Sequence, residues 1–314
     1  MRETELIRAL AARFRRCPAQ RNALFASDAE IVTMGEALWG ITTDAFSPDE
    51  DCFGNASPEL IGHNIAVATI SDLLAAGCQP SFYLHCLDVP PEGEAFVQRL
   101  CDGVSEVLDA CDAYLLGGDL GCATTWRCSA TALGLLKRSE PLTRLLPARV
   151  QALYVTGSLG DSNAAALQMV DPPSFELRLA SANSIRLLAS ACIDTSDGLI
   201  SALWQWHEVN PASRFELDLN AIPYAPAARE ASRSTGIPLP AFLLGGAGEY
   251  ELLFAADADA QVPDATRIGT VVPATAGDLR IQGGAALTEP PDPRSFADRR
   301  TYLDALLAHL ATWL

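Results

Sequence analysis

Helix-like and strand-like segments alternate along the whole chain, and this alternation limits the folds open to it. Ser57-Pro58-Glu59 is a typical helix start, with Ser at the N-cap and Pro at the first helical position. Gly77 followed by Pro80 is a typical stop, so we expect a helix over 58–76. Other strands are expected at 37–43, 81–88, 113–117 (short and buried), 125–136, 152–157, 191–194, 249–255 and 267–272, and other helices at 3–15, 92–111, 160–169, 175–190, 198–209 and 299–313. This order predicts an α/β (α+β) fold with mixed sheets.

The length of the chain, 314 residues, suggests two domains at about 100–200 residues per domain. Pro141 and Pro147 interrupt the pattern between an expected strand at 125–136 and the next one at 152–157. We therefore expect an N-terminal domain over 1–140 and a C-terminal domain over 141–314. The stretch 211–240 contains five prolines and is expected to form loops around a short helix.

Charge and composition exclude several classes of function. The formal net charge is −17, which repels phosphate backbones and anionic membranes, so nucleic acid is not an expected partner. No apolar run approaches the roughly 18–20 residues of a membrane helix, and the charged N-terminus is unlike a secretion signal, so we expect a cytoplasmic protein. The nine cysteines contain no C-x-x-C pair and the four histidines no i, i+4 pair, which argues against a zinc enzyme.

Aspartates next to Gly, Ser or Thr recur at the ends of the apolar segments. Taken singly, each is as well explained as a turn former or a helix cap. Taken together, converging carboxylates would repel one another unless cations neutralised them, and hard oxygen ligands select Mg²⁺. Mg²⁺ is commonly shared with substrate phosphates, so the acidic chain is compatible with binding ATP. The aspartates concerned are Asp28, Asp44, Asp72, Asp119, Asp194 and Asp197.

Two of these sites carry more local information than the rest. In LLGGDLG at 115–121, Gly117 and Gly118 permit a backbone whose N–H groups face a phosphate, although a tight turn explains them equally well. In IDTSDGL at 193–199, two carboxylates flank a hydroxyl where a strand leads into a helix. The chain contains neither a P-loop nor a protein-kinase signature, so neither of those nucleotide folds is expected.

With its motifs in order, the chain resembles the aminoimidazole ribonucleotide synthetase (AIR synthase-related) superfamily, and within it the thiamine-monophosphate kinases. The resemblance covers most of the chain. It is carried by SDAEIV at 27–32, TTDAF at 42–46, ATISDLLAAGCQP at 68–80, LLGGDLG at 115–121, PLTR at 141–144, YVTGSLGD at 154–161, IDTSDGL at 193–199 and GAGEYELLF at 246–254.

This resemblance implies a two-domain AIR synthase-like fold and a homodimer formed through the N-terminal sheets, with ATP and Mg²⁺ between the domains. The implied reaction is phosphoryl transfer to a small phosphorylated metabolite, without a covalent nucleophile. The implied metal ligands are Asp28, Thr42, Thr43, Asp44, Asp72, Asp119, Asp194 and Asp197, with Asp72, Asp119 and Asp197 in catalytic roles. The implied nucleotide contacts are Gly118, Asp119, Arg144 and Ser196.

The acceptor side departs from the family pattern. The family's Gly-Asp-Asp before the first metal motif is Ala26-Ser27-Asp28 here, which leaves one carboxylate. The position of a substrate-side His is occupied by Asp51, and an acidic substrate contact is replaced by Gly248, with Glu249 one position further on. The resemblance therefore implies an acceptor site at Asp51, Gly248 and Glu249, and a changed acceptor is plausible.

Two other hypotheses fit the same residues. The first is that the chain is an ATP-dependent synthetase of the same superfamily, which activates an amide or carboxylate oxygen. The second is a dimeric nucleotide-binding protein without catalysis, which is motivated by Ser27, Asp51 and Gly248. The products formed from ATP distinguish the three.

Overall fold

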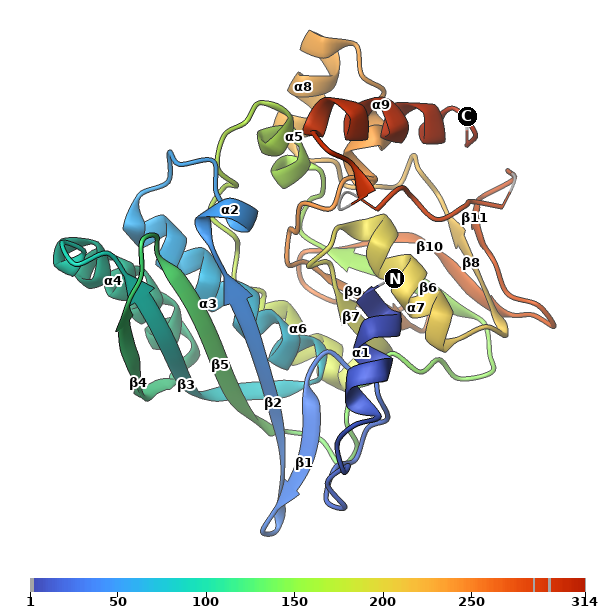
Figure 1. The fold of residues 1–314 in the computed structure, drawn as a ribbon. Helices are drawn as coiled ribbons and strands as arrows, with labels where there is room; N and C mark the ends of the chain where they lie inside the picture. Colours follow the sequence, from blue (N-terminus) through green and yellow to red (C-terminus); the bar gives the residue numbers. More distant parts are fainter. Residues whose placement is uncertain (1–2, 285, 293–294, 314) are drawn as a thin grey trace.

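The computed structural model describes residues 3–284, 286–292 and 295–313. The chain forms two mixed sheets with helices against them, and Figure 1 shows the sheets side by side, the first drawn in blue and green. This arrangement confirms the expected mixed α/β fold. No helix in the described part of the chain combines the length and the apolar character needed to cross a membrane.

The first sheet has five strands in the order β1-β2-β5-β3-β4. Neighbouring strands are antiparallel except β3 and β4, which are parallel. The strands are β1 (Glu30–Met34), β2 (Ala37–Phe46), β3 (Cys78–Val89), β4 (Tyr114–Cys122) and β5 (Arg127–Leu136). Along β5 buried and more exposed residues alternate, so one face of the sheet packs against helices and the other is open in a single chain.

The second sheet has six strands in the order β11-β8-β10-β6-β9-β7. Every residue of its inner strands β6 and β9 is buried, which is typical of strands covered on both faces. The strands are β6 (Gln151–Thr156), β7 (Ala189–Asp194), β8 (Ser213–Leu217), β9 (Leu252–Ala256), β10 (Ala265–Pro273) and β11 (Leu279–Ile281).

Helix α3 (Pro58–Ala75) joins the two sheets. Its apolar residues are spread around the whole circumference rather than along one stripe, as expected for a helix that is buried on most sides. It contacts β2, β3 and β5 of the first sheet and β7 and β9 of the second, and one apolar core includes residues from all of them. Polar residues on α3 are thereby carried to the junction of the sheets.

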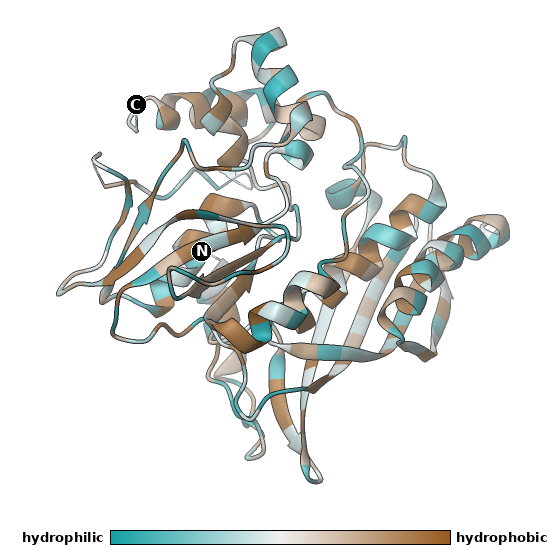
Figure 2. Cartoon of the chain, turned by 180° about the vertical axis from the view of Figure 1, so that it is seen from behind, coloured by the Kyte–Doolittle hydropathy of each residue, from teal (hydrophilic) through white to brown (hydrophobic). Residues whose placement is uncertain are grey.

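The remaining helices cover the outer surfaces. Helix α4 packs beside α3 against the first sheet, and Trp206 of α7 packs on Phe215 of β8 in the second. Helix α8, at the top of Figure 2, is largely hydrophilic, in contrast to the apolar strands and the helices between the sheets. These elements are α1 (Glu3–Ala11), α2 (Pro48–Asp51), α4 (Glu94–Cys111), α5 (Asp161–Leu167), α6 (Leu179–Leu188), α7 (Leu199–Val209), α8 (Pro226–Thr235), the 3-10 turn η1 (Leu239–Leu243) and α9 (Arg299–Leu310).

The expected helix over 58–76 is confirmed as α3, where the Ser57 hydroxyl accepts a hydrogen bond from the Leu60 N–H at 3.2 Å. The expected helices and strands have counterparts, although α1 and α6 are shorter than predicted. The short elements β1, α2, β8, η1 and β11 are not among the elements expected from the sequence. Strand β8 lies within 211–240, where loops around a short helix were expected.

Two strand predictions need correction. The segment 113–117 was expected to be a short buried strand, whereas β4 runs on to Cys122 and its side chains are largely exposed, because it is an edge strand paired only with β3. The second correction concerns Thr42, Thr43 and Asp44, which were expected where a strand gives way to an acidic loop. They lie inside β2, which continues to Phe46 because it pairs with β5 through that residue.

Candidate functional site

Three carboxylates from distant parts of the sequence meet at the junction of the two sheets. Asp28 precedes β1, Asp72 lies in the last turns of α3, and Asp194 is the final residue of β7. One oxygen atom from each lies within 4.8 Å of the others. We call these three residues the carboxylate cluster. It exists because α3 is buried between the sheets.

The chemistry of the cluster fits a hard divalent cation. Asp194 Oδ2 is buried and has no hydrogen-bond partner within the described chain, so it is available as a ligand. Thr42 Oγ1 donates to Asp72 Oδ2 at 2.5 Å, which orients the second carboxylate. Three carboxylates in so small a space are typical of Mg²⁺ rather than of a softer metal.

Burial makes this site electrostatically unfavourable without a cation. Burial, followed by the charge of Asp28, raises the pKa of Asp194 to about 7. The pKa of Asp72 is raised well above its ordinary value by burial and then by the charges of neighbouring carboxylates, Asp194 first among them. A bound cation would favour the charged forms of both groups, so cation binding and deprotonation are coupled.

Arg144 supplies a positive charge beside the cluster. Its Nη2 lies 2.7 Å from Asp28 Oδ1, and both side chains are largely buried. Its backbone carbonyl accepts hydrogen bonds from the side chains of Trp206 and Asn210, so α7 and the residue that follows it fix its position. Burial acts to lower the pKa of Arg144, but the charge of Asp28 and a hydrogen bond to it raise the pKa overall. Arg144 therefore stays charged where an anionic phosphate would approach.

Two further carboxylates lie near the cluster. Burial raises the pKa of Asp44 to about 6, against the opposing effect of a hydrogen bond with Thr69 of α3. Asp51, the last residue of α2, accepts a hydrogen bond from the Ser47 N–H at 2.7 Å. Burial raises its pKa to about 6 as well, although that hydrogen bond acts to lower it. A cation bound nearby would lower the pKa of both groups and favour their charged forms.

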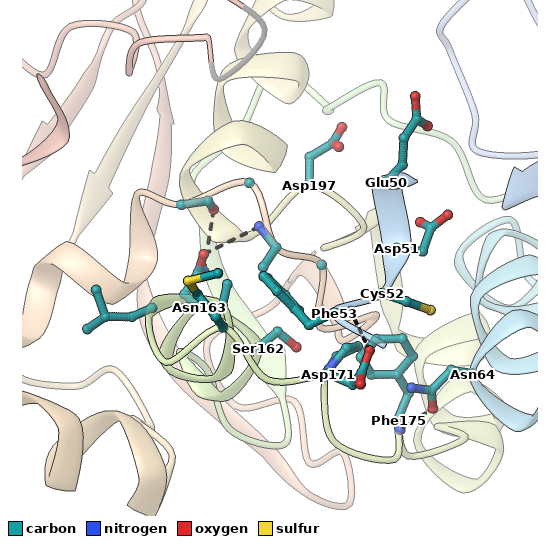
Figure 3. Close-up of a pocket in the computed structure, with 18 of the residues that line it drawn as sticks. Glu50, Asp51, Cys52, Phe53, Asn64, Ser162, Asn163, Asp171, Phe175 and Asp197 are labelled. Atoms are coloured by element: carbon teal, nitrogen blue, oxygen red, sulfur yellow. Dashed lines mark hydrogen bonds between the residues drawn. The ribbon is translucent and has the colours of Figure 1, made fainter. Parts of the chain in front are cut away.

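A cavity of about 680 Å³ lies next to these acids. Its polar lining includes Asp51, Ser196 and Asp197, and part of this lining is seen in Figure 3. Tyr250 also lines the cavity, with a left-handed φ of 55°. Burial raises the pKa of Tyr250 well above its ordinary value, and so do the charges of the surrounding carboxylates Asp194, Asp44, Asp51 and Asp197. Tyr250 therefore lines the cavity and is also close enough to the carboxylates for their charges to act on its hydroxyl group.

Gly248 lines the cavity, whereas Glu249 is not among its lining residues. A Cβ atom at position 248 would lie 2.1 Å from the carbonyl oxygen of Ser196, so no side chain fits there with this backbone. The buried Glu249 carboxylate instead accepts a hydrogen bond from the Gly160 N–H, and burial raises its pKa to about 8. The structure therefore brings Asp51 and Gly248 to the cavity but turns Glu249 away.

Gly118, Asp119 and Thr43 do not join the cluster within one chain. The strand register runs from Asp44 on β2 through β5 and β3 to Gly118 on β4, a separation of about 14 Å at roughly 4.8 Å per strand. Thr43 projects from the open face of the sheet, since it alternates with the buried Thr42. Asp119 shares that face because it is in register with the exposed Cys86 of β3. Thr43 Oγ1 donates to the Ala130 carbonyl at 3.0 Å.

Sequence reasoning missed some residues at this site. Tyr250 lies inside a motif that was singled out, yet its position between the carboxylates and the cavity depends on its left-handed backbone. The ring of Phe175 packs on that of Tyr250 at 4.6 Å between centroids, with the ring planes tilted by 51°, and Phe175 comes from a loop without any motif. Only the first of these carried a signal in the sequence.

Comparisons with known proteins agree with this architecture. Residues 26–136 match the family described as AIR synthase related protein, N-terminal domain. The chain is 30% identical over 224 residues to a thiamine-monophosphate kinase of Corynebacterium glutamicum, and the aligned region covers 65% of this chain and 67% of that protein. It is 27% identical over 234 residues to the thiamine-monophosphate kinase of Escherichia coli strain K12, covering 68% of this chain and 70% of that protein.

Solved structures share the fold. A structure described as AaThiL complexed with AMPPCP and TMP matches with a TM-score of 0.77 and 22% identity, over 90% of this chain and 96% of that chain. The hydrogenase maturation protein HypE in complex with ATP matches with a TM-score of 0.65 and 16% identity, over 85% of this chain and 90% of that chain. At these identities the likeness establishes the architecture, and function has to be argued from the site.

Proposed function

Since the chain belongs to the AIR synthase-related family as a thiamine-monophosphate kinase-like member, we propose that it transfers a phosphoryl group from Mg²⁺-ATP to a small phosphorylated acceptor. Thiamine monophosphate is the first acceptor to test, because it is the substrate named for the curated relatives. Binding of ATP is further supported by the related structure that holds ATP.

The observation that carries this proposal is the carboxylate cluster, with one arginine beside it and a cavity adjoining it. Asp28, Asp72 and Asp194 would hold Mg²⁺, which when bound neutralises charge on the phosphates of ATP. Thr42 and Asp44 would complete the ligand set from β2, whose register places both on the face toward α3. Asp197 and Ser196 line the cavity and would contact the nucleotide or the acceptor.

The chain's own residues would mainly orient the two substrates and neutralise the negative charge of the phosphates. Phosphoryl transfer needs little covalent chemistry, so its rate depends on positioning and on charge stabilisation. Arg144, kept charged beside Asp28, would contact a phosphate oxygen of the nucleotide. Asp51 and Gly248 would line the acceptor half of the cavity. The proposed catalytic set remains Asp72, Asp119 and Asp197.

A homodimer would give Gly118 and Asp119 a place in the site. Strand β4 exposes Leu115, Leu116 and Leu120, with 51%, 58% and 64% of their surfaces accessible. Such exposed apolar groups on one strand favour a partner surface. We propose that two chains pair through their first sheets along the exposed strand β4, and that Gly118 and Asp119 act across that interface.

The division of the chain into 1–140 and 141–314 is part of the same proposal. It falls between β5 and β6, the last strand of the first sheet and the first of the second. A cytoplasmic location is likewise proposed, since free cellular ATP is the donor that the function needs.

The experiment that tests the function measures ADP formation by the purified protein with Mg²⁺-ATP, with and without thiamine monophosphate, and identifies the products by mass. ADP together with thiamine diphosphate is the expected result. Free phosphate with a cyclised or ligated product would support a synthetase instead. ATP binding without turnover over a broad set of phosphorylated metabolites would support a non-catalytic nucleotide-binding protein.

A further inference from the structure

Two loops that are far apart in sequence form one wall of the cavity of about 680 Å³, which we call the acceptor cavity because the acceptor is proposed to bind there. The first, residues 52–57, follows α2 and contributes Cys52 and Phe53 to the lining. The second, residues 168–178, joins α5 to α6 and contributes Asp171 and Phe175. Neither loop contains regular secondary structure, so other contacts must hold them in place.

The Asp171 carboxylate connects the two loops directly. Its Oδ1 atom accepts a hydrogen bond from the Phe53 N–H at 2.6 Å, and its Oδ2 atom accepts one from the Asn55 N–H at 2.5 Å. Figure 3 shows Asp171 beside Phe53 at the cavity wall. Hydrogen bonds from backbone N–H groups to an ionised carboxylate are stronger than neutral ones. We call this pair of hydrogen bonds the Asp171 clasp.

The second loop is itself anchored to the buried helix α3. The Asn64 side chain donates to the Pro173 carbonyl at 2.9 Å and accepts from the Phe175 N–H at 3.0 Å. The Phe175 ring packs on Tyr250 at 4.6 Å between centroids. The loop that carries Asp171 is therefore fixed, and the clasp transmits that fixed position to residues 52–57.

Asp51 is the residue immediately before the clasped loop. Cys52, between Asp51 and the clasp, shows that both acids are close by: burial and then the charges of Asp171 and Asp51 raise the pKa of its thiol to about 12. Asp51 lines the cavity from the end of a helix of only four residues, α2, which contributes no buried residue. The position of Asp51 thus depends both on its hydrogen bonds with Ser47 and on the loop after it.

We propose that Asp171 is a positioning residue, whose carboxylate fixes the loop 52–57 and thereby sets Asp51 against the acceptor. This rests on the proposed function of the cavity as the acceptor site. Only a carboxylate supplies two acceptor atoms to two N–H groups at this position, since an amide offers one acceptor and two donors. The clasp acts on acceptor binding and leaves the ATP side unchanged, because its contacts do not involve the carboxylate cluster or Arg144.

The Asp171→Asn variant tests this inference by two measurements. The first is amide hydrogen exchange with residue-level fragmentation. In the wild-type protein, the N–H groups of Phe53 and Asn55 should exchange more slowly than that of Gly54, and in the variant both should exchange about tenfold faster. The second is steady-state kinetics: the KM for the acceptor should rise about tenfold, while the KM for ATP changes less than about twofold. Asp218→Asn is the matched control, since Asp218 also accepts a backbone hydrogen bond, from Asn220, in a turn outside the cavity lining.

Unchanged exchange at Phe53 and Asn55 in Asp171→Asn would overturn the clasp. Faster exchange with an unchanged acceptor KM would overturn its positioning role. If Asp171→Asn fails to fold, equal exchange rates at Phe53, Gly54 and Asn55 in the wild-type protein would still contradict the clasp. If the wild-type protein does not phosphorylate thiamine monophosphate, the proposed acceptor fails, whereas the exchange measurement still decides the clasp on its own.

Discussion

The carboxylate cluster and the acceptor cavity are built in different ways. Two members of the cluster lie on regular elements and the third directly precedes β1, and α3 brings them together because it is buried between both sheets. The cavity is lined partly by residues of α3, α5 and α9 and partly by loops, and these loops are held by a few hydrogen bonds such as those of Asp171 and Asn64. The residues proposed to bind the cation therefore sit on the rigid framework, while the choice of acceptor depends in part on loops, which tolerate sequence change.

The largest effect is expected when the cluster loses a charge. Asp72→Asn should lower kcat for ADP formation by at least about 100-fold, because one cation ligand is weakened at the centre of the site. The melting temperature should not fall, since the amide removes repulsion between buried acids. Asp218→Asn is the control in the same assay, and near-normal turnover by Asp72→Asn would break the distinction between the two regions.

A mixing experiment tests whether Asp119 acts across a dimer. Asp72→Asn and Asp119→Asn should each be inactive alone, because each removes a ligand from every site. When equal amounts are mixed and allowed to exchange subunits, one site in each mixed dimer is intact, so about a quarter of the activity should return. The measurement is ADP formation before and after mixing, and a mixture as inactive as its components would contradict the shared site.

A smaller and more selective effect is expected at the cavity. Asp51→Asn should raise the KM for the acceptor about tenfold with kcat changed by less than about threefold, because it alters binding of one substrate rather than the transferred group. Initial rates at varied acceptor and saturating ATP provide the test. A fall in kcat as large as that of Asp72→Asn would place Asp51 in the cluster instead.

The last prediction concerns the dependence of stability on pH rather than activity. The folded-state pKa values of Asp44 and Asp194 are raised to about 6 and about 7, so the folded state binds more protons than the unfolded state above about pH 4. Without divalent cations, the free energy of unfolding should therefore fall as the pH rises from about 4 to 7, because the buried carboxyl groups lose protons over this interval. Denaturant titrations should show this fall, and Mg²⁺ should reduce it. A stability that rises over this interval in cation-free buffer would contradict the raised values.

Features carried by regular elements could be predicted from the sequence, and features that depend on tertiary contacts could not. The α3 helix, with its Ser57 cap, and the aspartates Asp28, Asp72 and Asp194 could all be read from local patterns, because regular elements have strong signals. The open position of Asp119 could not, since it depends on which strand of the sheet β4 occupies. The clasp between Asp171 and a loop 116 residues away in sequence, at Asn55, had no local signal at all.

At Gly248 the sequence reveals a replacement but does not reveal which residue, if any, takes over its role. The sequence shows that an acidic residue of the family pattern is missing, and suggests Glu249 as its substitute. In the structure the carbonyl of Ser196 fills the space that a side chain at 248 would need, and Glu249 is turned toward Gly160. Side-chain direction on a loop is set by tertiary contacts, which one sequence does not reveal.

The carboxylate cluster is expected to bind a divalent cation. The most direct test is a titration of the ATP-free protein with Mn²⁺, a magnetic substitute for Mg²⁺, followed by electron paramagnetic resonance. The wild-type protein should bind Mn²⁺, and Asp194→Asn should bind it at least about tenfold more weakly because Asp194 Oδ2 is a free buried ligand atom. Equal Mn²⁺ affinity in the wild-type protein and in Asp194→Asn would show that the carboxylate cluster is not the cation site.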